Sequence, residues 1–102
     1  MLDLEPEHLE LIQRLLAVRL PAREVRAFGS RVRGRAKPTA DLDLAVMGAE
    51  PIPDLVQAEL RADFEESDLP FRVDLLAWQD APAGLREVIA REGVAVQTAP
   101  AK

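Results

Sequence analysis

The sequence contains no cysteine and no tyrosine among its 102 residues, and aromatic residues make up only 4% of the chain. Without cysteine the chain can form no disulfide, no thiolate zinc site and no cysteine nucleophile. Without tyrosine the protein cannot modify a tyrosine of its own. No apolar run approaches the length that spans a bilayer, and the acidic N-terminus Met1–Glu5 is unlike a signal peptide. We therefore expect a cytoplasmic chain without a membrane partner.

The chain also lacks an excess of positive charge. Its net charge of -5 argues against general nucleic-acid binding through a broad basic surface. The apolar fraction of 48% and the charged fraction of 30% are those of a globular protein. The length predicts one domain, residues 1–102, with a modest core. Four of the thirteen Lys and Arg residues nevertheless fall between positions 31 and 37, which leaves room for a local basic patch.

Three segments have apolar residues at helical spacing. The first runs from residue 5 to residue 20, and the second from residue 54 to residue 66. A third segment predicts a last helix that Asp80 can cap and that Gly93 ends.

Alternating polar and apolar residues predict the strands. The clearest examples are residues 42–47 and 71–78, and a shorter one covers residues 24–28. Residues 94–96 are interpreted as either a short final strand or a tail. The chain therefore mixes helices with strands.

A Gly-Ser pair follows the first predicted strand. Gly29 permits a tight turn that a side chain would obstruct, and Ser30 can cap a short helical turn. The connection that follows carries four basic residues: Arg31, Arg33, Arg35 and Lys37. Exposed backbone amides at such a turn bind anions, and arginine side chains match phosphate oxygens. This stretch is a candidate phosphate site.

Three aspartates are predicted to lie on one face of the sheet. Asp41 and Asp43 belong to the polar face of the second strand, with α-carbons about 6.5 Å apart at strand rise. Asp74 belongs to the polar face of the strand at 71–78. If these two strands are neighbours with their apolar faces on the same helices, side-chain parity brings all three carboxylates together.

Clustered carboxylates require a counter-charge. Two unit charges 4 Å apart repel by about 4 kcal/mol at an effective dielectric constant near 20. Either one carboxylate takes up a proton or a cation lies among them. Hard oxygen ligands favour Mg²⁺ or Mn²⁺, which complete their shells with water and substrate phosphates. Together with the neighbouring basic loop, this predicts two-metal phosphoryl or nucleotidyl transfer.

Each signal alone has a simpler explanation. An Asp-x-Asp pair at a strand entrance is usually solvated surface, and an arginine-rich loop is usually solvated too. Asp74 could merely pair with Arg72. The combination of glycine turn, basic loop, aspartate pair and third aspartate of matching parity favours a functional site.

At these residues the sequence resembles the minimal nucleotidyltransferases of the DNA polymerase β-like superfamily. Their motif is Gly-Ser, about ten residues, Asp-x-Asp and a third carboxylate on a later strand. Ala40 departs from it, because the family often has a small hydroxyl residue there. The resemblance implies an α/β (α+β) fold, with a small mixed sheet of about three to four strands and helices packed on it.

The resemblance also implies roles for the motif residues. Asp41 and Asp43 would hold two Mg²⁺ ions, and Asp74 would complete one metal site and accept the proton of the attacking hydroxyl. Gly29 and Ser30 would bind the β- and γ-phosphates of ATP. The basic residues would neutralise charge, with Arg31, Arg33, Arg35 and Lys37 as candidates.

Minimal members of this family are often encoded beside a HEPN-domain toxin, and they act as its antitoxin. The resemblance therefore implies transfer of AMP from ATP to a tyrosine of such a partner. The chain is too short for an acceptor domain, so the acceptor must bring its own surface or bind at a subunit interface. One alternative is a non-catalytic module that neutralises its partner by occlusion. Another is a nucleotidyltransferase for a small molecule or an RNA end.

Overall fold

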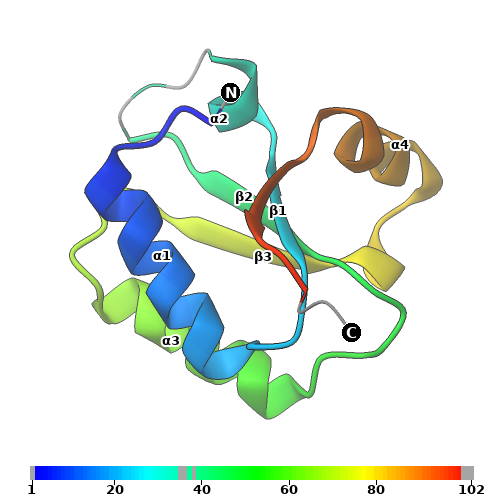
Figure 1. Ribbon diagram of the computed structural model, residues 1–102, viewed down its shortest axis with the longest axis horizontal. Helices are drawn as coiled ribbons and strands as arrows, with labels where there is room; N and C mark the ends of the chain where they lie inside the picture. The colour runs from blue at the N-terminus through cyan, green and yellow to red at the C-terminus, as the bar shows by residue number, and fades with distance from the viewer. Residues whose placement is uncertain (1, 35–36, 38, 100–102) are drawn as a thin grey trace.

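The computed structural model describes residues 2–34, 37 and 39–99. Within these residues one mixed sheet has the strand order β3-β2-β1-β4 (Figure 1). The strands are β1 (Val25–Phe28), β2 (Leu42–Val46), β3 (Val73–Ala77) and β4 (Val94–Gln97). The mixed sheet with packed helices that the sequence predicted is confirmed, and residues 94–97 form a strand rather than a tail.

Four α-helices are described around this sheet: α1 (Pro6–Arg19), α2 (Ser30–Arg33), α3 (Asp54–Glu66) and α4 (Ala83–Glu92). Proline begins α1, where its missing amide hydrogen costs nothing. Glu7 lies in the first turn of this helix and Arg19 in the last, which suits the helix dipole at both ends. The bounds predicted for α1 and α3 are therefore confirmed to within a residue.

The strand pairing places the two strongest strands side by side. β1 is antiparallel to both β2 and β4, whereas β2 and β3 are parallel. A parallel pair needs a crossover connection, and α3 supplies it between β2 and β3. In this register Asp43 lies opposite Asp74. The predicted adjacency of the two strands is confirmed.

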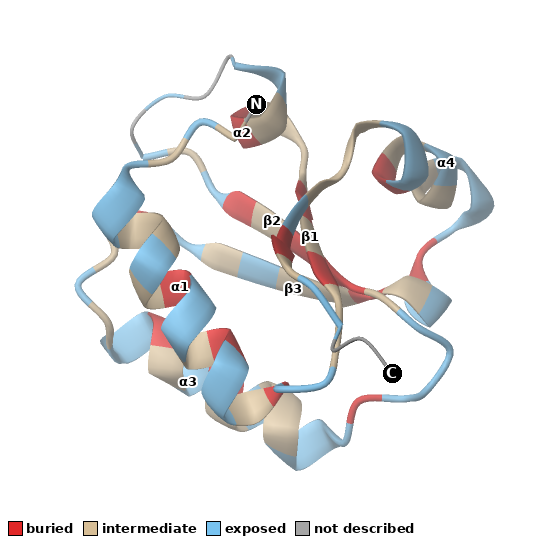
Figure 2. Ribbon diagram, in the orientation of Figure 1, coloured by how far each residue is buried: buried red, intermediate tan, exposed pale blue. Residues whose placement is uncertain are grey.

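The main core lies between the sheet and the pair α1 and α3. Ile12 and Leu16 of α1 and Leu60 of α3 pack against Leu42 and Leu44 of β2, and all five are buried. Figure 2 shows buried segments on α1, α3 and β2.

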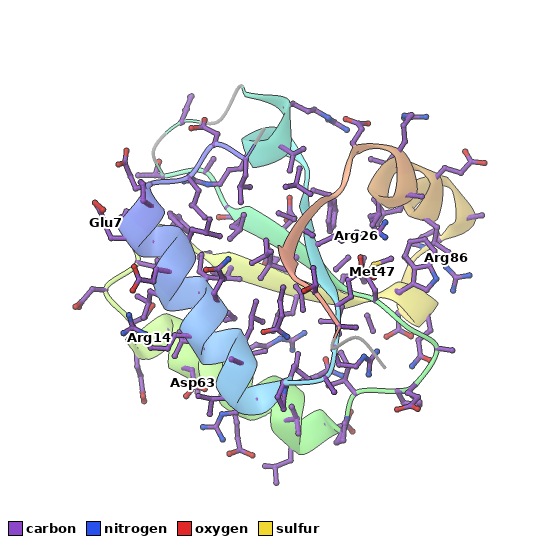
Figure 3. The ribbon with its side chains drawn as sticks, viewed as in Figure 1. Glu7, Arg14, Arg26, Met47, Asp63 and Arg86 are labelled. Atoms are coloured by element: carbon purple, nitrogen blue, oxygen red, sulfur yellow. The ribbon has the colours of Figure 1, made fainter. Side chains whose placement is uncertain are left out.

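A smaller cluster covers part of the opposite face of the sheet. Ala45 of β2, Ile89 of α4 and Ala81, which precedes α4, are buried there, and Met47 packs against them. Figure 3 shows Met47 and Arg86 on the side of the molecule where α4 lies. The second face is therefore also apolar, but only over part of its length.

Two predicted helix caps are wrong. Gly29 is the N-cap residue of α2, and Ser30 is its first helical residue. Asp80 lies in a short 3-10 helix, Trp78–Asp80, and Pro82 is the N-cap residue of α4. The start of α4 has no side-chain capping hydrogen bond. The same 3-10 helix ends β3 at Ala77, one residue earlier than predicted.

Within the described parts of the chain, none of the helices is both long enough and apolar enough to span a membrane.

Candidate functional site

The acidic site is built on the two parallel strands at the centre and edge of the sheet. Leu42 and Leu44 have no exposed surface, so the alternation of β2 directs Asp43 to the opposite face. Asp43 is half-buried, and Asp74 lies beside it in the parallel register and is exposed. Asp41 is exposed and precedes β2 by one residue. The structure thus brings the three predicted carboxylates into one neighbourhood.

Negative charge at this site is not fully compensated. Burial raises the pKa of Asp43, and the nearby carboxylates of Asp74 and Asp41 raise it further. The guanidinium of Arg72 lies 3.4 Å from Asp74, but both side chains are largely exposed and such a pair contributes little. A bound cation would relieve this repulsion.

The carboxylates fit a hard metal ion in their chemistry. All three offer oxygen donors, which suit Mg²⁺, and burial together with the charges of Asp74 and Asp41 raises the pKa of Asp43. Among the described residues, no three His, Cys, Asp or Glu side chains already enclose a common metal position. Side-chain movement, together with oxygens from a substrate, would be needed to complete a metal shell.

The backbone of Gly29 lies directly against Asp43. Gly29 has φ 86°, and a Cβ atom at this position would lie 2.5 Å from the Asp43 Oδ2 atom. Glycine is therefore required here both by the backbone conformation and by the close carboxylate. The backbone amides of Val32 and Arg33 donate to the Gly29 carbonyl and begin α2 immediately beside the acidic site.

Arg31 does not face solvent as a phosphate ligand would. Its side chain is 5% exposed, donates from Nε to the carbonyl of Ala40 at 2.9 Å, and donates from Nη1 to the carbonyl of Asp3 at 3.0 Å. The guanidinium also lies 4.1 Å from the ring centre of Phe71. The predicted role of Arg31 in neutralising phosphates therefore stays a prediction, and these contacts show that its guanidinium already binds backbone carbonyls. Arg31 thereby holds the backbone that leads into Asp41.

Arg33 has a different environment. It lies three positions after Ser30 in α2 and is exposed, and its Nε donates to Glu92 of α4 at 3.1 Å. This hydrogen bond lowers the pKa of Glu92, with a further contribution from Arg91. Lys37 is exposed, and Arg35 lies outside the described residues. Arg33 is thus the arginine of α2 available at the surface near Ser30.

A cavity of about 790 Å³ adjoins the acidic site along the edge of the sheet. Asp41 and Asp74 belong to its lining, as do Arg61 and Phe64 of α3 and Arg72. The sequence analysis did not find this cavity or the contribution of α3. Besides the two aspartates, the one residue of the lining that the sequence pattern indicated was Arg72, because it alternates with Asp74 along the predicted strand.

Comparison with known proteins gives a consistent result. A family model described as "Polymerase beta, Nucleotidyltransferase" matches residues 10–99. The sequence is 44% identical over 96 residues to the "Probable protein adenylyltransferase MntA" of Haemophilus influenzae, covering 94% of this chain and 84% of that relative. It is 37% identical over 81 residues to the "Protein adenylyltransferase MntA" of Thermococcus cleftensis, covering 79% of this chain and 81% of that relative.

A solved structure supports the same comparison. The chain is similar to one described as "Crystal structure of the toxin-antitoxin with AMP-PNP", with a TM-score of 0.72 and 26% sequence identity. The match covers 87% of this chain and 72% of that chain.

Proposed function

This chain belongs to the polymerase beta, nucleotidyltransferase family, and we propose that it is a protein adenylyltransferase. It transfers AMP from ATP to a tyrosine hydroxyl of a HEPN-domain toxin and thereby acts as the antitoxin. The carrying observation is the register of β2 and β3, which sets Asp43 beside Asp74 with Gly29 against the Asp43 carboxylate. The names of the two relatives and the nucleotide analogue in the similar toxin-antitoxin structure support the proposal.

The chain's own residues divide into two groups in this proposal. Gly29 and Ser30 bind the β- and γ-phosphates through the start of α2, and Arg33 exchanges Glu92 for phosphate oxygens. The carboxylates of Asp41, Asp43 and Asp74 provide the ligands for two Mg²⁺ ions. When bound, the Mg²⁺ ions supply positive charge against the phosphates and the departing group.

The transfer step conserves every atom. The tyrosine hydroxyl oxygen forms a bond to the α-phosphorus of ATP, while the bond from that phosphorus to the bridging oxygen of the β-phosphate breaks. Pyrophosphate leaves, and the partner gains one AMP unit in ester linkage. Asp74 is the most suitable acceptor for the hydroxyl proton, because it is exposed at the edge strand.

The proposal assigns the activity to a single domain formed by residues 1–102, supported by one sheet to which every described helix packs or connects. Location in the cytoplasm stays a prediction from the sequence, and cell fractionation tests it.

Intact mass measurement of both proteins tests the proposed function. The protein is incubated with its adjacently encoded partner, ATP and Mg²⁺, beside the double variant Asp41→Asn/Asp43→Asn. We expect the partner to gain one or more AMP units with the native protein and none with the double variant. A variant with Asp54→Asn, at the exposed start of α3, is the matched control and retains transfer.

Two other outcomes would contradict the proposal. Undiminished transfer by the double variant would remove the three-carboxylate site from the mechanism. No transfer by any form, together with equal neutralisation of the toxin by native and variant protein, would establish the non-catalytic occluding module instead.

A further inference from the structure

The cavity beside the acidic site runs along an open edge of the sheet. β3 is the last strand in the order β3-β2-β1-β4, and within residues 39–99 its ladder partner is β2. An edge strand presents backbone donors and acceptors that an added strand can pair with. The cavity of about 790 Å³ follows this edge and has Asp74 in its lining. An extended polypeptide therefore has both a space and a row of backbone partners beside the acidic site.

The lining of this cavity combines apolar and charged side chains. Leu69, Val73 and Leu75 are half-buried and offer part of their surface, whereas Phe64 and Phe71 are buried. Arg61 and Glu65 of α3 are exposed at the rim. Such a lining suits an aromatic or aliphatic side chain whose backbone stays near the polar rim.

The order of the strands sets the direction from which the acceptor must arrive. This step rests on the proposed function. Gly29 follows β1, Asp43 lies on β2, and Asp74 lies on β3, in that order across the sheet. Phosphates held at Gly29 place the departing pyrophosphate over the β1 side. Attacking and departing oxygens lie roughly in line on opposite sides of the phosphorus. The acceptor hydroxyl must therefore come from the β3 side, which is where the cavity lies.

We propose that the cavity between the β3 edge and α3 is the docking groove for the acceptor segment of the partner protein. The occupant is an extended polypeptide segment that carries the target tyrosine at the Asp74 end of the groove. Side chains of an extended segment alternate between its two faces, so a residue two positions from the tyrosine contacts the half-buried apolar side chains of Leu69 and Val73. The groove thus selects the tyrosine by the sequence around it.

The absence of cysteine from the chain allows a clean test. A variant with Glu65→Cys places one thiol at the exposed rim of the groove, and a bulky maleimide then blocks it. The matched control is Glu87→Cys, which is exposed on α4 and carries the same label. AMP transfer to the partner and binding of AMP-PNP with Mg²⁺ are measured for each protein with and without the label.

We expect the label at position 65 to reduce transfer at least tenfold while AMP-PNP affinity changes less than twofold. The same label leaves transfer by the Glu87→Cys control unchanged, and each unlabelled variant is the baseline for its own labelled form. Full transfer by the labelled Glu65→Cys protein would overturn the docking groove. Loss of AMP-PNP binding with the label would also overturn it, because the cavity would then hold the nucleoside. Absence of transfer by the unlabelled variants and the native protein would overturn the proposed function itself, and the acceptor assignment with it.

Discussion

The two faces of the sheet are covered to different extents. On the face toward α1 and α3, Leu42, Leu44 and Val46 of β2 have no exposed surface. On the face toward α4, Ala45 is equally buried, yet Asp43, two residues earlier on the same strand, remains half-exposed. Both faces of β2 therefore carry buried apolar residues, but only the face toward α4 is partly exposed to solvent.

This difference explains where the chemistry lies. A carboxylate beneath a complete helical layer would lose its hydration without gaining a partner, which costs several kcal/mol. The layer formed by α4 ends before Asp43, so the carboxylates remain accessible to a cation and a substrate. The covered face provides the stability, and the open face carries the carboxylates of the proposed site.

The largest expected effect concerns the open face. The substitution Asp74→Asn keeps the size of the side chain but removes a charge, and we expect AMP transfer to fall at least about 100-fold. Circular dichroism is expected to remain unchanged, since Asp74 is exposed. The control is Asp80→Asn, also exposed, on the 3-10 helix beyond β3. If the two variants transferred AMP equally well, Asp74 would have no role in the reaction.

The covered face is tested by Leu44→Ala. Leu44 has no exposed surface, so its truncation leaves a cavity and lowers the free energy of unfolding by about 2–5 kcal/mol. Leu55→Ala is the control, because Leu55 is 70% exposed and its loss changes stability by less than about 0.5 kcal/mol. Urea unfolding measures both. Similar values for the two variants would contradict the packing described here.

The junction between the Gly-Ser turn and the open face is tested by Gly29→Ala. We expect the free energy of unfolding to fall by about 1–3 kcal/mol because of backbone strain. The contact of the new methyl group with Asp43 lowers it further. Gly34→Ala separates the two causes. Gly34 also has positive φ, at 74°, but nothing lies within 4 Å of its Cβ position. If Gly34→Ala lowered the free energy of unfolding as much as Gly29→Ala does, the contact with the Asp43 carboxylate would have no energetic cost.

A smaller effect is expected on the outer surface of the covering helices. Arg19 of α1 lies 2.7 Å from Glu59 and 2.9 Å from Asp63 of α3, at partly exposed positions. Figure 3 marks Asp63 on α3, alongside α1. Substitution Arg19→Met is expected to lower the thermal unfolding temperature only slightly, and by less at high salt, because solvent and salt screen exposed ion pairs. Thermal unfolding at two salt concentrations checks this, and a cost that does not depend on salt would assign the effect to packing.

The most subtle test uses pH. The pKa of Asp43 is raised above its ordinary value of 3.8 by burial and by Asp74 and Asp41, so the folded protein binds this proton more tightly than the unfolded chain. Ionisation of Asp43 therefore destabilises the metal-free fold as pH rises through that range. We expect Asp43→Asn to be more stable than the native protein at pH 7 in chelator, with the advantage disappearing as pH falls to 3.8 and below. Lower stability of the variant at pH 7 would contradict this account.

Regular alternation made the central part of the site predictable from sequence. Leu42, Leu44 and Asp43 alternate so clearly that the buried face of β2 could be assigned, and Asp74 followed by the same parity. α3 was predicted with its observed bounds because its apolar residues recur at helical spacing after Pro53. Local periodicity was sufficient in these cases.

Features that depend on distant partners were not predictable. Arg31 turns inward because Phe71 and the carbonyl of Asp3 are present around it, and neither is near it in sequence. The burial of Ala45 depends on α4, which packs on the face that alternation alone would leave polar. The cavity arises from α3 and the β3 edge together, so no single segment encodes it.

The parallel pairing of β2 with β3 also bears on how the protein folds. Asp43 and Asp74 become neighbours only when the whole of α3 has formed and the chain has closed back on itself. Such non-local pairing forms late, because closing a long loop costs entropy before its contacts compensate. The proposed site is therefore incomplete until the crossover through α3 has closed. A nascent or partly unfolded chain lacks the paired carboxylates, so modification of the partner would begin only with the fully folded protein.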